Sequence, residues 1–116
     1  MTRVFRLPIV MLGLMVGTVG AQAASFPCEK AATPDEKAIC ASLAINDLDV
    51  ELAVRFEILK SVLAMGNRAQ LQDDQESWLK ERGTCAADTA CLRQVYETRL
   101  KVLRGVFAEF AKQGPQ

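Results

Sequence analysis

Apolar side chains recur at steps of three and four along most of the chain after residue 42. The clearest series spans about residues 43–65, with an apolar face of Ile45, Leu48, Leu52, Phe56, Leu59 and Leu63. This spacing predicts a long helix with one buried face. The helix is expected to end at Met65-Gly66-Asn67, with Gly66 in the left-handed conformation and Asn67 capping the next helix.

Two more helices are predicted downstream. The first, about residues 68–82, has an inward stripe of Leu71, Gln75, Trp78 and Arg82, with Leu79 beside it. We expect Gly83 to end it. The second, about residues 89–112, follows Asp88, whose side chain suits a helix cap. Its buried face comprises Leu92, Tyr96, Arg99, Leu103, Phe107 and Phe110, widened by Val95 and Val106.

A shorter helix is predicted from Pro34 to about Cys40. Thr33-Pro34-Asp35-Glu36 combines a capping residue, a proline at the first helical position and a glutamate that completes a capping box. No stretch shows a sustained period of two, the signature of a half-buried strand. The predicted fold class is all-α: a small antiparallel helical bundle of three main helices plus a short N-terminal helix.

Short connections make consecutive helices antiparallel neighbours, which sets their register. Counting outward from the two turns puts Asp49 level with Arg82, and Trp78 level with both Phe56 and Tyr96. We therefore expect an Asp49–Arg82 ion pair beneath an aromatic layer and an aliphatic layer of Leu63, Leu71 and Leu103. The residues assigned to the structural core by this reasoning and by the stripes are Asp49, Phe56, Gln75, Trp78, Arg82, Tyr96 and Arg99.

The last helix is longer than the one before it, so Val106, Phe107 and Phe110 extend past the predicted layers. An apolar overhang of this kind suggests a partner or a homodimer contact. Two alternatives remain open: Phe26 and Pro27 cover it, or the helix ends earlier.

Residues 1–23 have the pattern of a secretory signal peptide. Arg3 and Arg6 precede an apolar run of about 14 residues, which is short for a membrane span, and Ala21-Gln22-Ala23 is a small-x-small cleavage site. We expect a single domain over residues 24–116, exported to the periplasm. No lipid-attachment box precedes Cys28, so no membrane anchor is expected after cleavage.

Charge excludes one class of partner. The leader holds two of the 14 basic residues and none of the 14 acidic ones, which leaves the remaining domain slightly acidic. A nucleic-acid-binding domain would present a basic face instead.

The four cysteines, Cys28, Cys40, Cys85 and Cys91, all follow the leader. An even number in a short exported chain predicts two disulfides, and three pairings are possible. The local pairing would close loops of about 13 and 7 residues and stabilise the fold by roughly 3 and 2 kcal/mol. A metal site is not expected, because the chain has no histidine and no Cys-x-x-Cys spacing.

Catalysis is not expected either. Without histidine there is no Ser-His or Cys-His dyad. Two acidic clusters, Asp47/Asp49/Glu51 and Asp73/Asp74/Glu76, could in principle serve glycoside cleavage. Their positions on helix faces favour solvated surface, with one structural ion pair at Asp49. We expect no cofactor and no enzymatic activity.

The order of motifs carries a resemblance. Cys28, Glu36-x-x-Ile39-Cys40, Leu48-Asp49, Gln75-x-x-Trp78-x-x-x-Arg82-x-x-Cys85 and Cys91-Leu92-x-x-x-Tyr96-x-x-Arg99 together resemble the LprI-like lysozyme-inhibitor family. The match runs from Cys28 to about Leu103. Phe56 stands where that family commonly has Tyr, and Gly83 where an Asp commonly follows the arginine. The resemblance implies an exported helical inhibitor whose partner is lysozyme or an endogenous muramidase.

Two surfaces could bind such a partner. One is the Gly83–Ala90 turn, which a Cys85–Cys91 bridge would hold rigid; alternatively the bridge only staples the bundle. The candidate inhibitory residues are Thr84, Asp88 and Thr89, with Arg68 and Lys80 as basic alternatives. The other surface is the Val106/Phe107/Phe110 overhang. It belongs to the alternative function, in which the protein inhibits nothing and acts as an envelope adaptor that binds another protein through this end.

Overall fold

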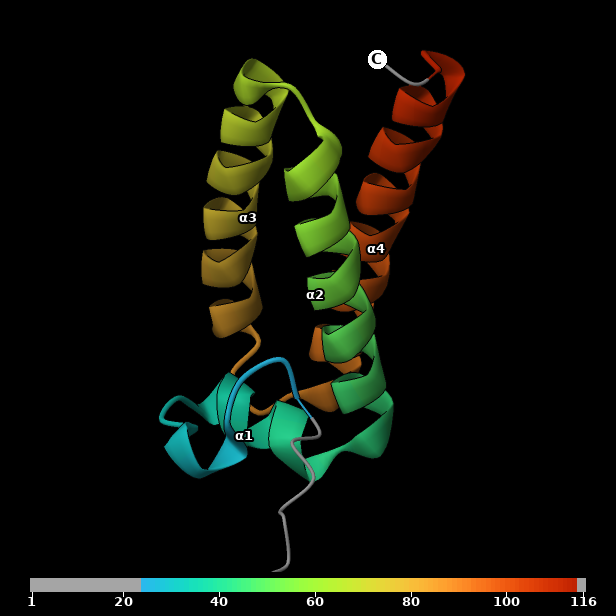
Figure 1. Ribbon diagram of the computed structural model, residues 1–116. Coiled ribbons are helices and arrows are strands. Elements are labelled where there is room, and N and C mark those ends of the chain that lie inside the picture. Colours follow the sequence, from blue (N-terminus) through green and yellow to red (C-terminus); the bar gives the residue numbers. More distant parts are fainter. Residues whose placement is uncertain (1–23, 115–116) are drawn as a thin grey trace, which may run out of the picture.

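The computed structural model describes residues 24–114, and this part of the chain contains helices and no strand. A 3-10 turn, η1 (Cys28–Lys30), precedes the four helices α1 (Pro34–Ala41), α2 (Leu43–Val62), α3 (Met65–Thr84) and α4 (Thr89–Lys112) (Figure 1). The all-α prediction is confirmed. The predicted signal peptide lies outside the described residues.

The three long helices form an up-down-up bundle, and α1 crosses one end of it (Figure 1). The most extensive packing is between α2 and α4, which run parallel. We call the end that carries α1 and the α3–α4 connection the disulfide end. The opposite end, formed by the α2–α3 connection and the last turns of α4, is the open end.

The start of α1 follows its sequence signal. The Glu36 carboxylate accepts the backbone N–H groups of Ala32 and Thr33, at 2.7 and 3.1 Å, and Pro34 occupies the first helical position. These bonds hold the pKa of Glu36 below its ordinary value. The predicted capping box is therefore confirmed, and α1 enters the bundle end at a fixed angle.

The expected turn at Gly66 is wrong. The chain reverses at Leu63 and Ala64, both extended, and Gly66 and Asn67 lie inside the first turn of α3. Leu63 is buried, so its packing fixes where α2 must stop, and two extended residues reverse the chain without a left-handed position. Arg68 Nη2 donates to the carbonyl of Leu63, which satisfies one of the free acceptors at the end of α2.

The expected stop at Gly83 is also displaced. Helix α3 continues to Thr84, and the left-handed residue is Ala86, with φ of 50°. Cys85 is buried, so the helix continues far enough to carry its sulfur into the core. Leu79, expected beside the inward stripe, is 42% exposed and does not belong to the core.

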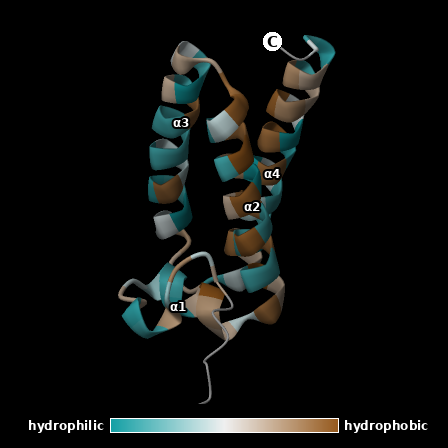
Figure 2. Cartoon of the chain, in the orientation of Figure 1, coloured by the Kyte–Doolittle hydropathy of each residue, from teal (hydrophilic) through white to brown (hydrophobic). Residues whose placement is uncertain are grey.

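The core runs the length of the bundle and draws unequally on its helices. The largest fully buried side chains are Tyr96, Ile39, Ile45, Leu59, Leu92, Leu100 and Leu103. None of these comes from α3, which is the most hydrophilic of the long helices (Figure 2) and buries only Leu71, Trp78 and Arg82. Leu100, absent from the predicted face, occupies the position one turn after Tyr96.

Candidate inhibitory site

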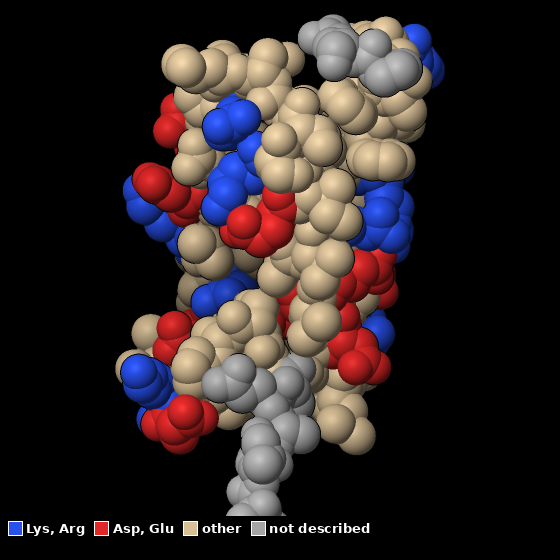
Figure 3. Space-filling model, in the orientation of Figure 1, with Lys and Arg blue, Asp and Glu red and all other residues tan. Residues whose placement is uncertain are grey.

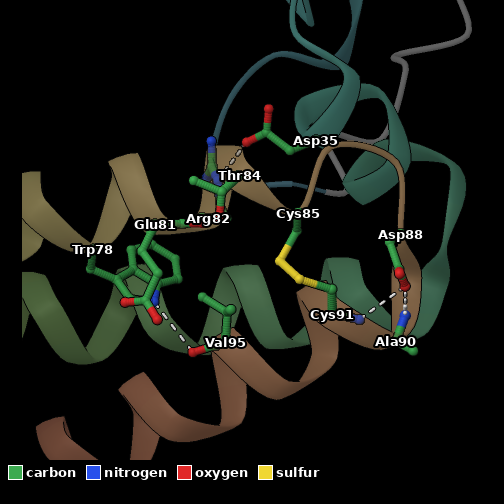
Figure 4. Close-up of a disulfide and its surroundings, with 10 residues drawn as sticks. All are labelled: Asp35, Trp78, Glu81, Arg82, Thr84, Cys85, Asp88, Ala90, Cys91 and Val95. Carbon is green, nitrogen blue, oxygen red and sulfur yellow. Dashed lines mark hydrogen bonds and ion pairs between the residues drawn. A yellow bond between two sulfur atoms is a disulfide. The ribbon is translucent and has the colours of Figure 1, made fainter.

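The Gly83–Ala90 turn closes the disulfide end between α3 and α4. Cys85 and Cys91 are joined by a disulfide with Cα atoms 5.5 Å apart (Figure 4). Within the turn, the N–H of Cys85 donates to the carbonyl of Arg82, and the N–H of Asp88 donates to that of Cys85. A covalent bridge and local hydrogen bonds therefore hold one backbone conformation, as expected for a rigid turn.

Asp88 begins α4. Its Oδ1 accepts the backbone N–H groups of Ala90 and Cys91, both at 3.0 Å (Figure 4). The predicted cap is confirmed, and the carboxylate lies where the helix dipole favours a negative charge. Since both bonds use the same oxygen and the turn depends on them, Asp88 shapes the site.

The five candidate residues do not form one cluster. Thr84, Asp88 and Thr89 are exposed within the turn, and Lys80 is exposed one helical turn before Thr84 on the same face of α3. Arg68 lies 16 positions before Thr84, about 24 Å along the same helix. It belongs to the open end, where it bonds Leu63. The structure thus brings four of the five together.

A buried ion pair lies beneath the turn, and it differs from the predicted one. Arg82 Nε donates to Asp35 Oδ2 of α1 at 2.9 Å, with side chains 10% and 5% exposed. Burial alone would raise the pKa of Asp35, but bonding from Thr33 and the charge of Arg82 hold it below its ordinary value. The direct Asp49–Arg82 pair is therefore wrong, because α1 crosses the end of α3 and supplies a nearer carboxylate.

The Tyr96 hydroxyl connects the Asp49 carboxylate to the Arg82 guanidinium. The hydroxyl donates to Asp49 Oδ1 at 2.7 Å and accepts a 3.4 Å bond from Arg82 Nη1. Burial first, and the neighbouring Asp49 second, raise the pKa of Tyr96. Asp49 and Arg82 thus lie at the same level of the bundle, as the register predicted. The neutral hydroxyl of Tyr96 lies between their side chains.

The aromatic layer is partly as expected. The rings of Trp78 and Tyr96 meet edge to face with centroids 5.1 Å apart, and Trp78 Nε1 donates to the Val95 carbonyl. Phe56 is only half-buried and lies under Lys60 Nζ, 5.5 Å from its ring centroid. The layer among the described residues is therefore a ring pair, with Phe56 packed at its margin.

Gln75 and Arg99 belong to the fold, as expected. Both Nε and Nη2 of Arg99 donate to Gln75 Oε1, at 3.1 Å each, which ties α4 to α3. Burial lowers the pKa of Arg99. Packing and hydrogen bonds between helices thus account for the motif residues Gln75, Trp78, Arg82, Tyr96 and Arg99.

The open end is apolar and less completely packed. Val106 and Phe110 pack against the core, whereas Phe107 is 47% exposed, with its ring centroid 6.5 Å from that of Phe110. A hollow of about 250 Å³ lies between α4 and the α2–α3 hairpin, lined in part by Leu63, Leu71, Val106 and Phe110. Phe26 and Pro27 do not cover this end, because they precede η1 at the disulfide end.

An exposed apolar strip on α2 was not foreseen from the sequence. The strip consists of four apolar residues at intervals of four positions, each between 40% and 54% exposed: Val50, Val54, Ile58 and Val62. An uncharged strip runs down the front of the molecule over α2 (Figure 3). The period of four was visible in the sequence, but the opposite face of the same helix carried the stronger apolar series.

Neither acidic cluster has the geometry of a catalytic pair. Asp73, Asp74 and Glu76 are exposed on α3, and Asp47 is exposed on α2, whereas Asp49 is buried against Tyr96. In the part of the chain that the structure describes, no group of acidic or cysteine side chains could hold a metal ion. The same residues contain no helix with the length and apolar character to cross a bilayer.

These features define a class of protein: a small helical domain held together at one end by two disulfides, Cys28–Cys40 and Cys85–Cys91, which is the local pairing. The chain belongs to the LprI family, whose model, described as "Lysozyme inhibitor LprI", matches residues 28–111. The comparisons with curated proteins and with solved structures found no match. The resemblance inferred from the motifs is confirmed, and paired cysteines in a lysozyme-inhibitor family indicate an exported protein.

Proposed function

We propose that this chain is a periplasmic inhibitor of lysozyme-type muramidases and that it acts by placing the Gly83–Ala90 turn in the catalytic cleft. The observation that carries this proposal is the turn itself, closed by a disulfide and fixed by the Asp88 cap. The family supplies the class of partner. The turn supplies a pre-ordered element that loses little conformational entropy on binding.

The surface of the turn suits insertion into a narrow cleft. The side chains exposed within the turn are short: Thr84, Ala86, Ala87, Asp88, Thr89 and Ala90. Cys85 points inward and anchors the backbone to the core. The tip is therefore slender, and no long side chain must be ordered for it to enter.

The chemistry of the turn narrows the candidate contacts. A muramidase cleft holds two carboxyl groups that flank the scissile bond. The Thr84 hydroxyl already donates to the Glu81 carbonyl at 2.6 Å, and the Asp88 carboxylate only accepts hydrogen bonds, two of them in the cap. The Thr89 hydroxyl and the Lys80 ammonium are the groups left to donate to cleft carboxylates.

A matched pair of substitutions tests the location of the site. Ala87→Trp enlarges the turn, and Ala108→Trp makes the same change at an exposed position of α4 near the open end. In a turbidity assay of cell-wall lysis, we expect Ala87→Trp to weaken inhibition by about 100-fold, equivalent to about 2.7 kcal/mol. Ala108→Trp should inhibit like the unmodified protein; the reverse result would contradict the proposal.

The individual contacts are tested by Thr89→Ala and Lys80→Ala, each of which should weaken inhibition by about 10-fold, or about 1.4 kcal/mol. Arg68→Ala is the comparison, because Arg68 lies at the open end. Undiminished inhibition by both Thr89→Ala and Lys80→Ala would remove the two named donors from the mechanism. Complete absence of inhibition by the unmodified protein across several lysozyme classes would remove the mechanism altogether.

The second candidate function is an envelope adaptor that binds a protein through the Val106/Phe107/Phe110 end. It is favoured by the half-exposed Phe107 ring and by the apolar hollow beside Phe110. The adaptor hypothesis predicts that Ala108→Trp disrupts binding of the protein partner and that Ala87→Trp does not. The same pair of variants therefore separates the two functions.

A further inference from the structure

A buried polar chain at the disulfide end joins all four helices to the segment before η1. Asp35 of α1 accepts from Arg82 of α3, Arg82 donates to the Tyr96 hydroxyl of α4, and Tyr96 donates to Asp49 of α2. The second oxygen of Asp49, Oδ2, accepts the backbone N–H of Ser25 at 2.7 Å. The chain of bonds therefore ends at the backbone nitrogen of Ser25.

The charges in this chain do not balance. It holds two buried carboxylates, Asp35 and Asp49, and one guanidinium, Arg82. Arg82 forms its ion pair with Asp35, and Asp49 makes no ion pair with any lysine or arginine of the described residues. A buried carboxylate without a cationic partner is strongly destabilising. One more positive charge close to Asp49 would therefore stabilise the folded chain.

The position of Asp49 beside the start of the domain indicates a source for that positive charge. The sequence predicts signal cleavage between Ala23 and Ala24, which would make the backbone nitrogen of Ala24 a free ammonium. Bond lengths keep consecutive backbone nitrogens less than about 4.3 Å apart. Because the Ser25 nitrogen is 2.7 Å from Asp49 Oδ2, the Ala24 nitrogen lies within about 7 Å of that oxygen, and a free terminus can rotate closer.

We propose that Asp49 is the binding site for the amino terminus of the processed chain, so that removal of the leader supplies the cation missing from the buried network. Before cleavage the Ala24 nitrogen belongs to a neutral amide and the network carries an excess negative charge. After cleavage two cations face two carboxylates. Processing thereby completes the folding of the disulfide end, independently of which partner the protein binds.

The surroundings allow the ammonium to bind without complete loss of water. Ala24 packs against the core, and a shallow hollow of about 480 Å³ opens beside Ala24 and Ser25 over Val50 and Val54. The charged or titratable groups around the site are Asp49 and Glu57 of α2, Tyr96 of α4, Arg82 of α3 and Asp35 of α1. Among these groups, the Asp49 carboxylate is the one that binds this segment directly, through the N–H of Ser25.

The experiment compares three forms of the disulfide-bonded protein: one that begins with a free Ala24, one acetylated on Ala24, and one that retains Gln22-Ala23. At pH 7 we expect the free form to unfold about 4–8 °C above the acetylated form, the shift that a stability difference of about 1 kcal/mol produces in a domain of this size. The form that retains Gln22-Ala23 should unfold at the same temperature as the acetylated form. Equal midpoints for the free and acetylated forms would overturn the proposal.

Asp49→Asn should abolish the difference between the free and acetylated forms, because the ammonium then has no carboxylate to bind. Asp47→Asn is the matched control, since Asp47 lies one half-turn away on α2 and is exposed. It should leave the difference intact. A difference that persists in Asp49→Asn would also overturn the proposal; should that variant not fold, the comparison of free and acetylated native sequence still decides.

The dependence on pH gives an independent readout. An α-ammonium has a pKa of about 8 in an unfolded chain, and a carboxylate partner raises it in the folded state. The extra stability of the free form is therefore complete below about pH 8 and disappears as pH rises through the raised value. At about pH 10.5 the free and acetylated forms should unfold together, and a constant difference up to that pH would contradict an ammonium–carboxylate contact.

Discussion

The two ends of this bundle are built differently. At the disulfide end, two covalent bridges, a helix laid across the bundle and a buried polar chain fix the backbone of α1, α3 and α4. At the open end, α2 and α3 meet in a two-residue connection, and α4 diverges from them toward its C-terminus (Figure 1). Apolar contacts alone hold Val106 and Phe110 there.

Rigidity in this small domain is concentrated at the disulfide end. A chain of this length has a limited core, so cross-links contribute a large share of its stability. Here they lie at one end, next to the turn proposed to enter a partner. The opposite end is left to weaker packing, and local opening is expected to begin there.

The largest expected effect comes from the buried ion pair. Arg82→Met leaves Asp35 buried without its cation, and we expect a loss of about 3–5 kcal/mol in the free energy of unfolding, measured by urea denaturation at pH 7. Arg104→Met is the control, because its 2.7 Å pair with Glu51 lies on the surface, with Arg104 53% exposed. That change should cost less than about 1 kcal/mol. Equal costs would contradict the contrast in burial.

Removal of the bridges comes next. Replacing Cys28 and Cys40 by alanine should lower the free energy of unfolding by about 3 kcal/mol, and replacing Cys85 and Cys91 by about 2 kcal/mol, according to the loops that each closes. Inhibition should follow the opposite order, because only Cys85–Cys91 shapes the proposed turn. A stability-corrected assay in which both pairs lose inhibition equally would count against the turn as the site.

Acid should weaken the buried ion pair at the disulfide end. The pKa of Asp35 is lower in the folded chain than in the unfolded chain. Its contribution to stability is therefore present above the unfolded pKa of about 4 and is lost as pH falls through the lower folded value. Denaturation between pH 5 and pH 2 should show this loss in the unmodified protein, and a shallower slope in Asp35→Asn.

Local sequence signals gave the helices but not every boundary. The Glu36 box and the Asp88 cap act within four residues, so the chain alone specifies them. Gly66 and Gly83 carried strong stop signals that the structure does not use, because the burial of Leu63 and Cys85 decides where the chain turns. Packing of one apolar or sulfur-bearing side chain outweighed the glycine preference at both places.

Long-range partners were harder to predict. Periodicity placed Trp78 beside Tyr96 correctly, since both lie on faces that meet in any antiparallel register. It could not place Asp35, 47 residues from Arg82, because that pairing depends on how α1 crosses the bundle. Within the candidate site, Thr84, Asp88 and Thr89 lie in one short turn, so the sequence alone groups them. Arg68 lies at the other end of α3, as helix length alone indicates. Whether any of them contacts a partner stays a prediction.

The smallest effect is expected at the open end, where it tests the contrast between the two ends of the bundle most directly. Phe107→Ser removes a ring that is 47% exposed, so the free energy of unfolding should change by no more than about 0.5 kcal/mol. Leu103→Ala, one turn earlier and fully buried, should cost about 2–5 kcal/mol by the same measurement. A loss above about 2 kcal/mol for Phe107→Ser that grows with protein concentration would mean that a second copy covers this ring. The open end would then be an interface, and the contrast between the two ends would hold only for the isolated chain.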